Sequence, residues 1–272
     1  MKTNDVSVTS MYISLWCNRE LITASVSRSI LGRYRGSLLG VMWSFFNPLL
    51  MLAVYTFVFS EVFNARWGTG SDSKTEFALV LFAGMIVFNL FADCINQAPT
   101  LILSNVNYVK KVVFPLEILP VVSLLSALFH SVISLFIWVL AYTLLFGVPS
   151  WTVFYLPIIW VPYMLSILGL GWGLASLGVY FRDVSQIVGV FITILMFMSG
   201  VFYPISSLPE IYQNLFYINP LVPIIEQTRD VLYFGREPNL YMILLSWLIG
   251  FFVSWGGYIW FQKTRKGFAD VI

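Results

Sequence analysis

Charged residues are scarce in this sequence. Only 10% of its 272 residues are Asp, Glu, Lys or Arg, whereas a typical soluble domain carries about a quarter. None of these four residue types occurs between Gly36 and Ser60, or between Ile118 and Phe181. Because 59% of the residues are hydrophobic and the mean hydropathy is +0.84, the composition excludes a soluble globular protein. It indicates a polytopic membrane protein.

Residues and motifs for catalysis or metal binding are equally rare. The sequence has two cysteines, Cys17 and Cys94, and one histidine, so it predicts neither a disulfide framework nor a Cys/His site for zinc or haem. It lacks a glycine-rich loop ending in Gly-Lys-Ser/Thr, which excludes ATP binding through a P-loop. It also lacks the Gly-x-Ser-x-Gly motif of a serine nucleophile. We therefore expect no catalytic residue, metal site or cofactor in this chain, and no nucleic-acid partner.

Two ionisable residues lie inside the apolar runs, Asp93 and His130. A membrane-embedded ionisable residue is a functional candidate by default. Asp93 lies near the end of its run, where a structural hydrogen-bonding role is favoured, and His130 has no acidic residue beside it in sequence. This shortage of charges argues against an ion-coupled or proton-coupled carrier. A transporter without its own ATPase motif must then take its energy from a partner.

The hydrophobic runs predict an all-α fold with six transmembrane helices. A helix of about 20 apolar residues crosses a bilayer core of about 30 Å. Gly147 to Ser150 divides a run too long for one helix into two spans. We expect one six-span domain at 37–262, preceded by a cytoplasmic segment 1–36 and followed by a basic tail 263–272. The predicted spans are 37–60, 77–96, 116–146, 152–180, 184–201 and 240–261.

The distribution of basic residues predicts the orientation. Four of the fifteen Lys and Arg residues fall on the expected outer segments, namely Arg66, Lys74, Arg229 and Arg236, and the other eleven fall on inner segments. Basic residues are retained on the cytoplasmic side. Both termini are therefore expected in the cytoplasm. The N-terminus does not have the pattern of a cleavable signal peptide.

The segment before the first span predicts a helix lying on the membrane. At 100° per residue across 11–31, one face carries Tyr12, Leu15, Trp16, Ile22, Val26 and Ile30. This pattern and the basic flank are typical of an interfacial amphipathic helix, although an ordinary soluble helix is the alternative. Within the first span, Asn47-Pro48 is expected to kink or open the helix.

Three further stretches have specific expectations. Residues 97–117 form a polar, basic cytoplasmic segment that contains a short helix. Residues 202–238 hold five prolines, four of them before Glu226, and two apolar pieces too short to span, which predicts two re-entrant or interfacial helices. In the fourth span, Gly169 and Gly173 are four residues apart, as are Gly171 and Ala175, and this spacing favours close helix packing.

The chain resembles the permease subunit of ABC-2 type polysaccharide exporters, which export O-antigen, capsule or teichoic acid. The resemblance extends over nearly the whole chain. It is carried by RYRGSLLGVMWSFFNPLLMLAVYTFVF at 33–59, LSNVNYVKKVVFPLEILP at 103–120, FRDV at 181–184, SGVFYPISSLPE at 199–210 and NPLVPIIEQTRD at 219–230.

The resemblance implies a homodimer in the lipid of the bacterial inner membrane, bound to two copies of a cytoplasmic ABC ATPase that supplies ATP and Mg²⁺ chemistry. A polysaccharide on a polyprenyl pyrophosphate lipid would pass between the two permeases. The helix that docks on the ATPase, the coupling helix, would include Ser104, Asn105, Asn107, Tyr108, Lys110 and Lys111. An outer gate would include Phe202, Tyr203, Pro204, Tyr212, Phe216, Asn219 and Pro220.

Spans one and five of each copy would line the channel. Sugar rings pack on aromatic rings, so the candidate lining residues are Trp43, Phe45, Phe46, Phe191 and Phe197, for which lipid contact or internal packing is the alternative.

Arg33 and Arg35 stand where the lipid pyrophosphate would arrive, because the planar guanidinium suits phosphate. Their alternative role is to anchor the chain and set its topology. For the whole chain, the alternative functions are an ABC-2 exporter of a drug or small lipid, and a membrane-embedded enzyme, for which the sequence shows no reactive constellation.

Overall fold

The structure, a computed structural model, describes residues 7–58, 67, 74–110 and 114–272, and these residues contain helices and no strand. The all-α prediction is confirmed. The helices are α1 (Val8–Cys17), α2 (Arg19–Arg33), α3 (Trp43–Tyr55), α4 (Lys74–Gln97), α5 (Val106–Lys110), α6 (Ile118–Phe146), α7 (Leu156–Tyr180), α8 (Val184–Met198), α9 (Glu210–Phe216), α10 (Leu221–Arg229), α11 (Leu240–Thr264) and α12 (Phe268–Val271). Short 3₁₀ turns precede or connect several of them, and a π-helical turn, Asp230–Phe234, extends α10.

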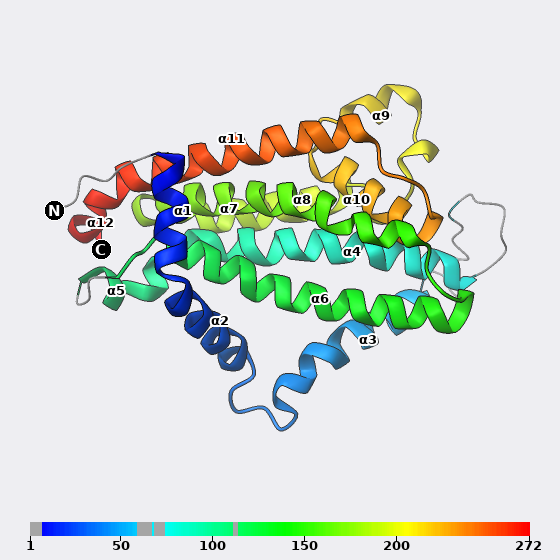
Figure 1. Ribbon diagram of the computed structural model, residues 1–272, viewed down its shortest axis with the longest axis horizontal. Helices are drawn as coiled ribbons and strands as arrows, with labels where there is room; N and C mark the ends of the chain where they lie inside the picture. Colours follow the sequence, from blue (N-terminus) through cyan, green and yellow to red (C-terminus); the bar gives the residue numbers. More distant parts are fainter. Residues whose placement is uncertain (1–6, 59–66, 68–73, 111–113) are drawn as a thin grey trace.

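Five apolar helical stretches in the described part of the chain are long enough to cross a membrane: Gly40–Val58, Thr75–Thr100, Ile118–Phe146, Trp151–Tyr180 and Leu240–Val271. Figure 1 shows the long helices α4, α6, α7 and α11 running along the long axis of the molecule, with α8 beside them. α4 is the central one. In its most apolar stretch 83% of the residues are buried, against 6% for the stretch that contains α3.

The expected fifth span, 184–201, is shorter than the others. α8 has 15 residues, which rise about 22 Å at 1.5 Å per residue. That is less than the bilayer core of about 30 Å. The helix ends at Ser199-Gly200, where Gly200 has a positive φ of 64°, a conformation that glycine adopts without steric cost.

α7 and α11 pack backbone against backbone through glycine. A Cβ on Gly169 would lie 2.2 Å from the Val253 carbonyl oxygen, and a Cβ on Gly257 would lie 2.1 Å from the Gly169 carbonyl oxygen. The predicted close packing of the fourth span is therefore correct for Gly169. It is wrong for Gly173, because a Cβ there would meet nothing within 4 Å. Spacing alone does not reveal which small residue faces the neighbouring helix.

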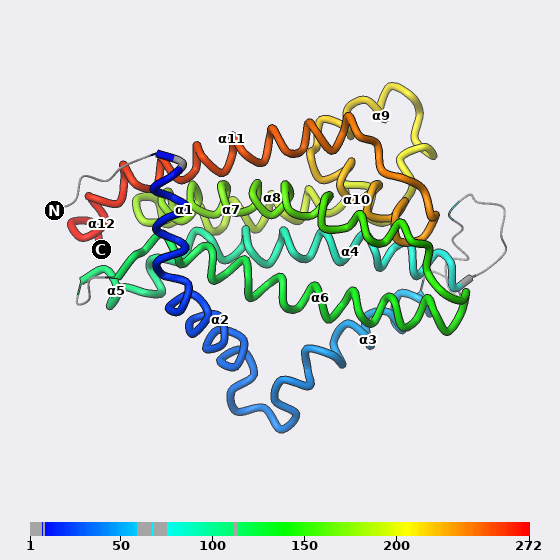
Figure 2. The backbone as a smooth tube through the Cα atoms, viewed as in Figure 1, coloured from blue at the N-terminus to red at the C-terminus, as the bar shows by residue number. Residues whose placement is uncertain are grey.

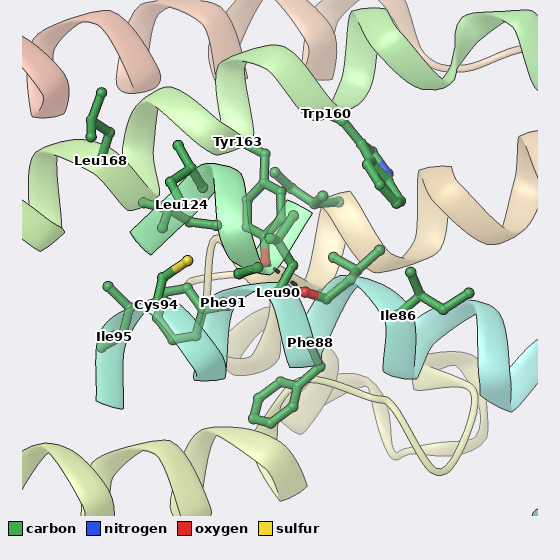
Figure 3. Close-up of a cluster of buried hydrophobic side chains, with 14 of the residues drawn as sticks. Ile86, Phe88, Leu90, Phe91, Cys94, Ile95, Leu124, Trp160, Tyr163 and Leu168 are labelled. Carbon is green, nitrogen blue, oxygen red and sulfur yellow. Dashed lines mark hydrogen bonds between the residues drawn. The ribbon is translucent and has the colours of Figure 1, made fainter. Parts of the chain in front are cut away.

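Aromatic side chains with a polar tip form hydrogen bonds between helices at the centre of the bundle. Tyr163 on α7 donates through its hydroxyl to the Val87 carbonyl at 2.8 Å (Figure 3). The indole of Trp138 on α6 donates to the Leu79 carbonyl at 2.8 Å. Each ring buries a large apolar surface while its donor is satisfied. Both acceptors are on α4, so these contacts fix α6 and α7 around the central helix.

The N-terminal region differs from the prediction of one continuous helix. The single helix expected at 11–31 is divided at Asn18, whose φ of −99° and ψ of 14° end α1 and start α2, and the Asn18 amide donates to the Ser14 carbonyl at 2.7 Å. On the expected apolar face Ile22 is buried, whereas Trp16 is 71% exposed. α2 and α3 form the two arms of a V whose junction lies away from the bundle (Figure 2), and both helices contact α6. α3 runs through Asn47-Pro48 without ending there.

The two ends of the bundle carry different elements. The C-terminus, α5 and α12 lie at one end, and α9 and α10 lie at the other (Figure 1). The polar segment between α4 and α6 is thus on the same end as the basic tail. The two short helices expected after α8 are present at the opposite end, as α9 and α10.

Candidate functional site

Residues 97–117, which include the predicted coupling helix and are called the coupling segment below, begin with short turns rather than one continuous helix. Two 3₁₀ turns, Ala98–Thr100 and Leu103–Asn105, precede the five-residue α5. Among the predicted contact residues Ser104, Asn107 and Lys110 are exposed and available to a partner, and Lys111 lies outside the described residues.

Two predicted contact residues are turned inward instead. Tyr108 stacks on Phe114 with ring centroids 4.2 Å apart, and Arg28 on α2 donates to its hydroxyl at 3.5 Å. Asn105 donates to the Leu101 carbonyl at 2.8 Å. Tyr108 therefore connects the coupling segment to α2, while Asn105 stabilises the turn that precedes α5.

Glu117 joins four elements at this end of the bundle. Its carboxylate accepts from Arg265, just after α11, at 2.6 Å and from the Ser14 hydroxyl on α1 at 2.9 Å. Its carbonyl accepts from the Trp172 indole on α7 at 2.8 Å. Only 8% of the Glu117 side chain is exposed, so the ion pair is weakly screened by solvent. The sequence analysis missed this residue, although a single carboxylate directly before a 64-residue stretch without charge was a visible signal.

A polar cavity lies between the α2–α3 arms and the bundle. It has a volume of about 260 Å³, and its lining includes Arg33, Tyr34, Asp93 and His130. The Arg33 guanidinium lies 3.5 Å from the Asp93 carboxylate, and the Tyr34 hydroxyl lies 3.5 Å from His130 Nδ1. Serine and asparagine supply most of the remaining polar lining: Ser44, Asn47, Asn89, Ser131 and Ser134.

This cavity brings together residues that are far apart along the chain. Asp93 takes an ion-pair role with Arg33, and His130 has Asp93 as a neighbour in the same cavity although no acid is near it in sequence. The acid and the histidine come from α4 and α6, whose packing brings them together. Arg35 does not line the cavity and is exposed.

The cavity continues toward the coupling segment beneath α2. A second cavity of about 170 Å³ shares Arg33, Asp93 and His130 with the first. A third, of about 210 Å³, shares Ser29, Gln97 and Ser123 with the second and reaches Tyr108. α2 therefore lies over a polar groove that extends from the coupling segment to α3.

The aromatic residues expected along the channel lie in two groups. On α3, Trp43 is 37% exposed, and Phe45 contacts Phe46 with ring centroids 6.2 Å apart. On α8, Phe191 and Phe197 are each more than half exposed. α3 packs mainly on α4 and α6, whereas α8 packs mainly on α4 and α7, so one chain alone does not bring the two groups together.

Several residues expected at the outer gate contact one another or the end of α8, and together with their neighbours on α9 and before α10 they are called the outer cluster below. Tyr203 donates to the Phe197 carbonyl at 2.5 Å and its ring lies 6.2 Å from that of Phe216. Phe202 lies 5.8 Å from Phe197, centroid to centroid. Asn219 donates to the Met198 carbonyl at 3.1 Å. Pro220 caps α10, Pro204 precedes a 3₁₀ turn, and Tyr212 is exposed.

Arg229 is buried, although the sequence analysis assigned it to an outer loop. Only 3% of the residue is exposed. Its guanidinium donates to the carbonyls of Val80, Gly200 and Val201 at 3.0, 2.8 and 2.6 Å, and lies 4.4 Å from the Trp67 ring centroid. Burial lowers its pKa to about 9, which leaves it charged at neutral pH. Arg229 therefore holds the end of α8 against α4.

Within the ranges that the structure describes, no three His, Cys, Asp or Glu side chains converge. The features that stand out are instead the coupling segment, the polar groove beneath α2 and the outer aromatic cluster.

Comparison with known proteins identifies the family and agrees with the resemblance seen in the sequence. The ABC-2 type transporter family matches residues 20–233. The O-antigen export system permease protein RfbA of Myxococcus xanthus is 27% identical over 261 residues, which cover 95% of this chain and 97% of that protein. RfbA of Klebsiella pneumoniae is 23% identical over 93% of this chain, and the polysialic acid transport protein KpsM of Escherichia coli is 23% identical over 88%. This chain belongs to the ABC-2 type transporter family.

Proposed function

We propose that this chain is the membrane subunit of an ABC transporter that exports a lipid-linked polysaccharide, O-antigen in the first instance, across the inner membrane. A separate ATPase subunit supplies the energy. The observation that carries the proposal is the end-to-end similarity to O-antigen export permeases, 95% of this chain against 97% of the Myxococcus protein. The capsule-related relatives cover less of the chain at comparable identity.

The arrangement of the helices supports a docking role for one end of the bundle. Ser104, Asn107 and Lys110 are exposed on the coupling segment. The buried Glu117 ties that segment to α1, α7 and the end of α11. A displacement imposed by a partner at α5 is therefore transmitted to the bundle through short polar contacts rather than lost in a loose loop.

The proposal includes six membrane crossings with both termini in the cytoplasm. α8 is the fifth crossing helix in chain order and is added to the five longer stretches, and a local thinning of the bilayer compensates for its length, as is common for short spans. α9 and α10 are re-entrant helices at the outer face, and α1 and α2 lie at the inner interface. The excess of Lys and Arg on the inner segments supports this orientation.

Two copies form the working transporter, with two ATPase subunits. The exposed aromatics of α3 and α8 support this arrangement, because a second copy can bring the two groups to one channel that a single chain does not form. Trp43, Phe191 and Phe197 then offer ring faces to sugars, and Tyr203, Phe216 and their neighbours close the outer end.

The lipid pyrophosphate meets the exposed Arg35 first. Arg33 is engaged by Asp93 at 3.5 Å, so its charge is partly compensated, whereas the Arg35 side chain is exposed at the foot of the V. Arg35→Ala should reduce export at normal protein level and topology, and Arg35→Lys should rescue it only in part because the planar fork is lost. A loss that tracks misinsertion would leave Arg35 with a topological role alone.

Deletion of the gene is the primary test of cargo. Cells should lose surface polysaccharide and accumulate lipid-linked polymer inside, and the intact gene should restore export. Sensitivity to drugs with surface polysaccharide unchanged would instead support the small-molecule exporter. Measuring both phenotypes in one strain separates the two functions.

A further inference from the structure

A mixed-charge pocket lies at the outer end of the molecule, next to the outer cluster, with which it shares Pro204. Its volume is about 380 Å³. Half of its lining residues belong to α10 and the π-helical turn that follows, and α10 lies at the end of the bundle opposite α5 and α12 (Figure 1). The lining residues are Trp67, Pro204, Ser206, Glu226, Arg229, Asp230, Phe234 and Arg236.

The two carboxylates of this pocket share one side of the helix. Glu226 and Asp230 are four residues apart, a spacing that places side chains on one face. One Glu226 oxygen, Oε2, accepts from the Tyr217 hydroxyl at 2.8 Å, and no donor in the described part of the chain reaches the other. Asp230 lies 3.7 Å from Arg236, a distance at which a ligand hydroxyl can still compete.

Planar cations and aromatic rings complete the lining. Arg236 is 70% exposed and lies 5.1 Å from the Phe234 ring centroid. Arg229 lies 4.4 Å from the Trp67 ring centroid. Carboxylates and guanidinium groups bind vicinal hydroxyls through paired hydrogen bonds, and ring faces pack on the C–H faces of sugars.

The charges of the pocket decide between classes of ligand. Two carboxylates and two guanidinium groups leave no net charge, so neither an anion nor a cation is favoured. A divalent cation would need more oxygen ligands than two carboxylates and would be repelled by Arg229 and Arg236. An uncharged polyhydroxy ligand uses both kinds of group at once.

We infer that this pocket binds a saccharide unit of the exported polymer as it leaves the transporter. The inference rests on the proposed export of polysaccharide and adds a binding site within one subunit, outside the channel between subunits. Glu226 also connects the pocket to the outer cluster through its bond from Tyr217, so occupancy of the pocket is coupled to the residues proposed to close the exit.

The test uses the complete transporter with its ATPase in lipid nanodiscs. The probe is the surface polysaccharide of the source cells, freed from its lipid by mild acid, and binding is measured by saturation-transfer NMR. Glu226→Gln and Asp230→Asn should each weaken binding on the order of tenfold, the value of a hydrogen bond to a charged group. Glu237→Gln is the matched control, because Glu237 is exposed nearby and does not line the pocket.

A second pair of variants blocks the pocket with a bulky side chain, and its control at the neighbouring position shows whether such a substitution causes misfolding. Ser206 is exposed and lines the pocket, whereas its neighbour Ser207 is exposed and does not. Ser206→Trp should block binding and slow export in cells, and Ser207→Trp should leave both unchanged. Equal binding by the three pocket variants and the two control variants, while the intact transporter still exports polymer, would overturn the pocket alone. Normal surface polysaccharide after gene deletion would overturn the export function and the pocket together.

Discussion

The buried Arg229 offers the sharpest test of what holds the outer end together. Two substitutions separate its charge from its geometry. Arg229→Met keeps the length of the side chain and removes every donor, whereas Arg229→Lys keeps the charge and loses the planar fork. Arg236→Met is the control, because its side chain is 70% exposed.

The structure sets the expected magnitude. The guanidinium donates to three carbonyls, and two of them, on Gly200 and Val201, lie beyond the end of α8. A buried acceptor left without a donor costs about 1–3 kcal/mol. The cost is partly offset because a buried charge no longer has to be desolvated. We expect Arg229→Met to lose about 3–5 kcal/mol of unfolding free energy, and Arg236→Met to lose under about 1 kcal/mol.

The lysine variant decides the mechanism. One ammonium on a shorter reach cannot donate along the three directions that the fork serves, so Arg229→Lys should be destabilised about as much as Arg229→Met. Thermal unfolding of the purified protein in detergent measures the loss, with about 10 °C expected for a change of this size. Full stability of Arg229→Lys would refute the reasoning, because charge alone would then hold the segment.

Three further predictions follow from particular contacts. Gly169→Ala should lower the unfolding temperature, because its Cβ would lie 2.2 Å from a carbonyl oxygen of α11, whereas Gly173→Ala meets nothing within 4 Å and should be neutral or slightly stabilising. Lys110→Glu should reduce co-purification of the ATPase and export without changing the melting temperature, and unchanged co-purification would remove Lys110 from the contact. Burial raises the pKa of Glu226, so ionisation of this carboxyl costs stability as pH rises through its folded pKa. Glu226→Gln should therefore melt higher than the wild type at pH 7.5 and no higher at pH 4, and a lower melting temperature at pH 7.5 would contradict this sign.

The long apolar runs of the sequence predicted the four long helices of the bundle well, because the thickness of a bilayer imposes a minimum length on each helix. The four long spans at 77–96, 116–146, 152–180 and 240–261 correspond to α4, α6, α7 and α11. The turn at Gly147 is where α6 ends, with φ of 92°. The predicted helix boundaries were wrong in segments outside the spans, where bilayer thickness does not set the length of a helix. The helix expected at 11–31 is divided at Asn18, and the coupling helix is five residues of α helix after two 3₁₀ turns.

Side-chain partners were much harder to predict from the sequence. Glu117 and Arg265 are 148 residues apart and Arg229 and Val80 are 149 apart, and no periodicity connects positions so distant. The aromatic residues of the outer cluster were predicted from a family motif, but their mutual contacts depend on how α8 ends. His130 shows the same limit, because its acidic neighbour comes from another helix.

The sequence by itself determined that this chain is a helical membrane protein, where most of its long apolar helices lie, and to which family it belongs. These properties depend on composition, local periodicity and motif order, all of which are local along the chain. Only the tertiary structure decided that Arg33, Asp93 and His130 share a cavity, that Arg229 is buried, and that a mixed-charge pocket lies beside the outer cluster. Such sites depend on which faces of separate helices meet, and helix packing sets those faces.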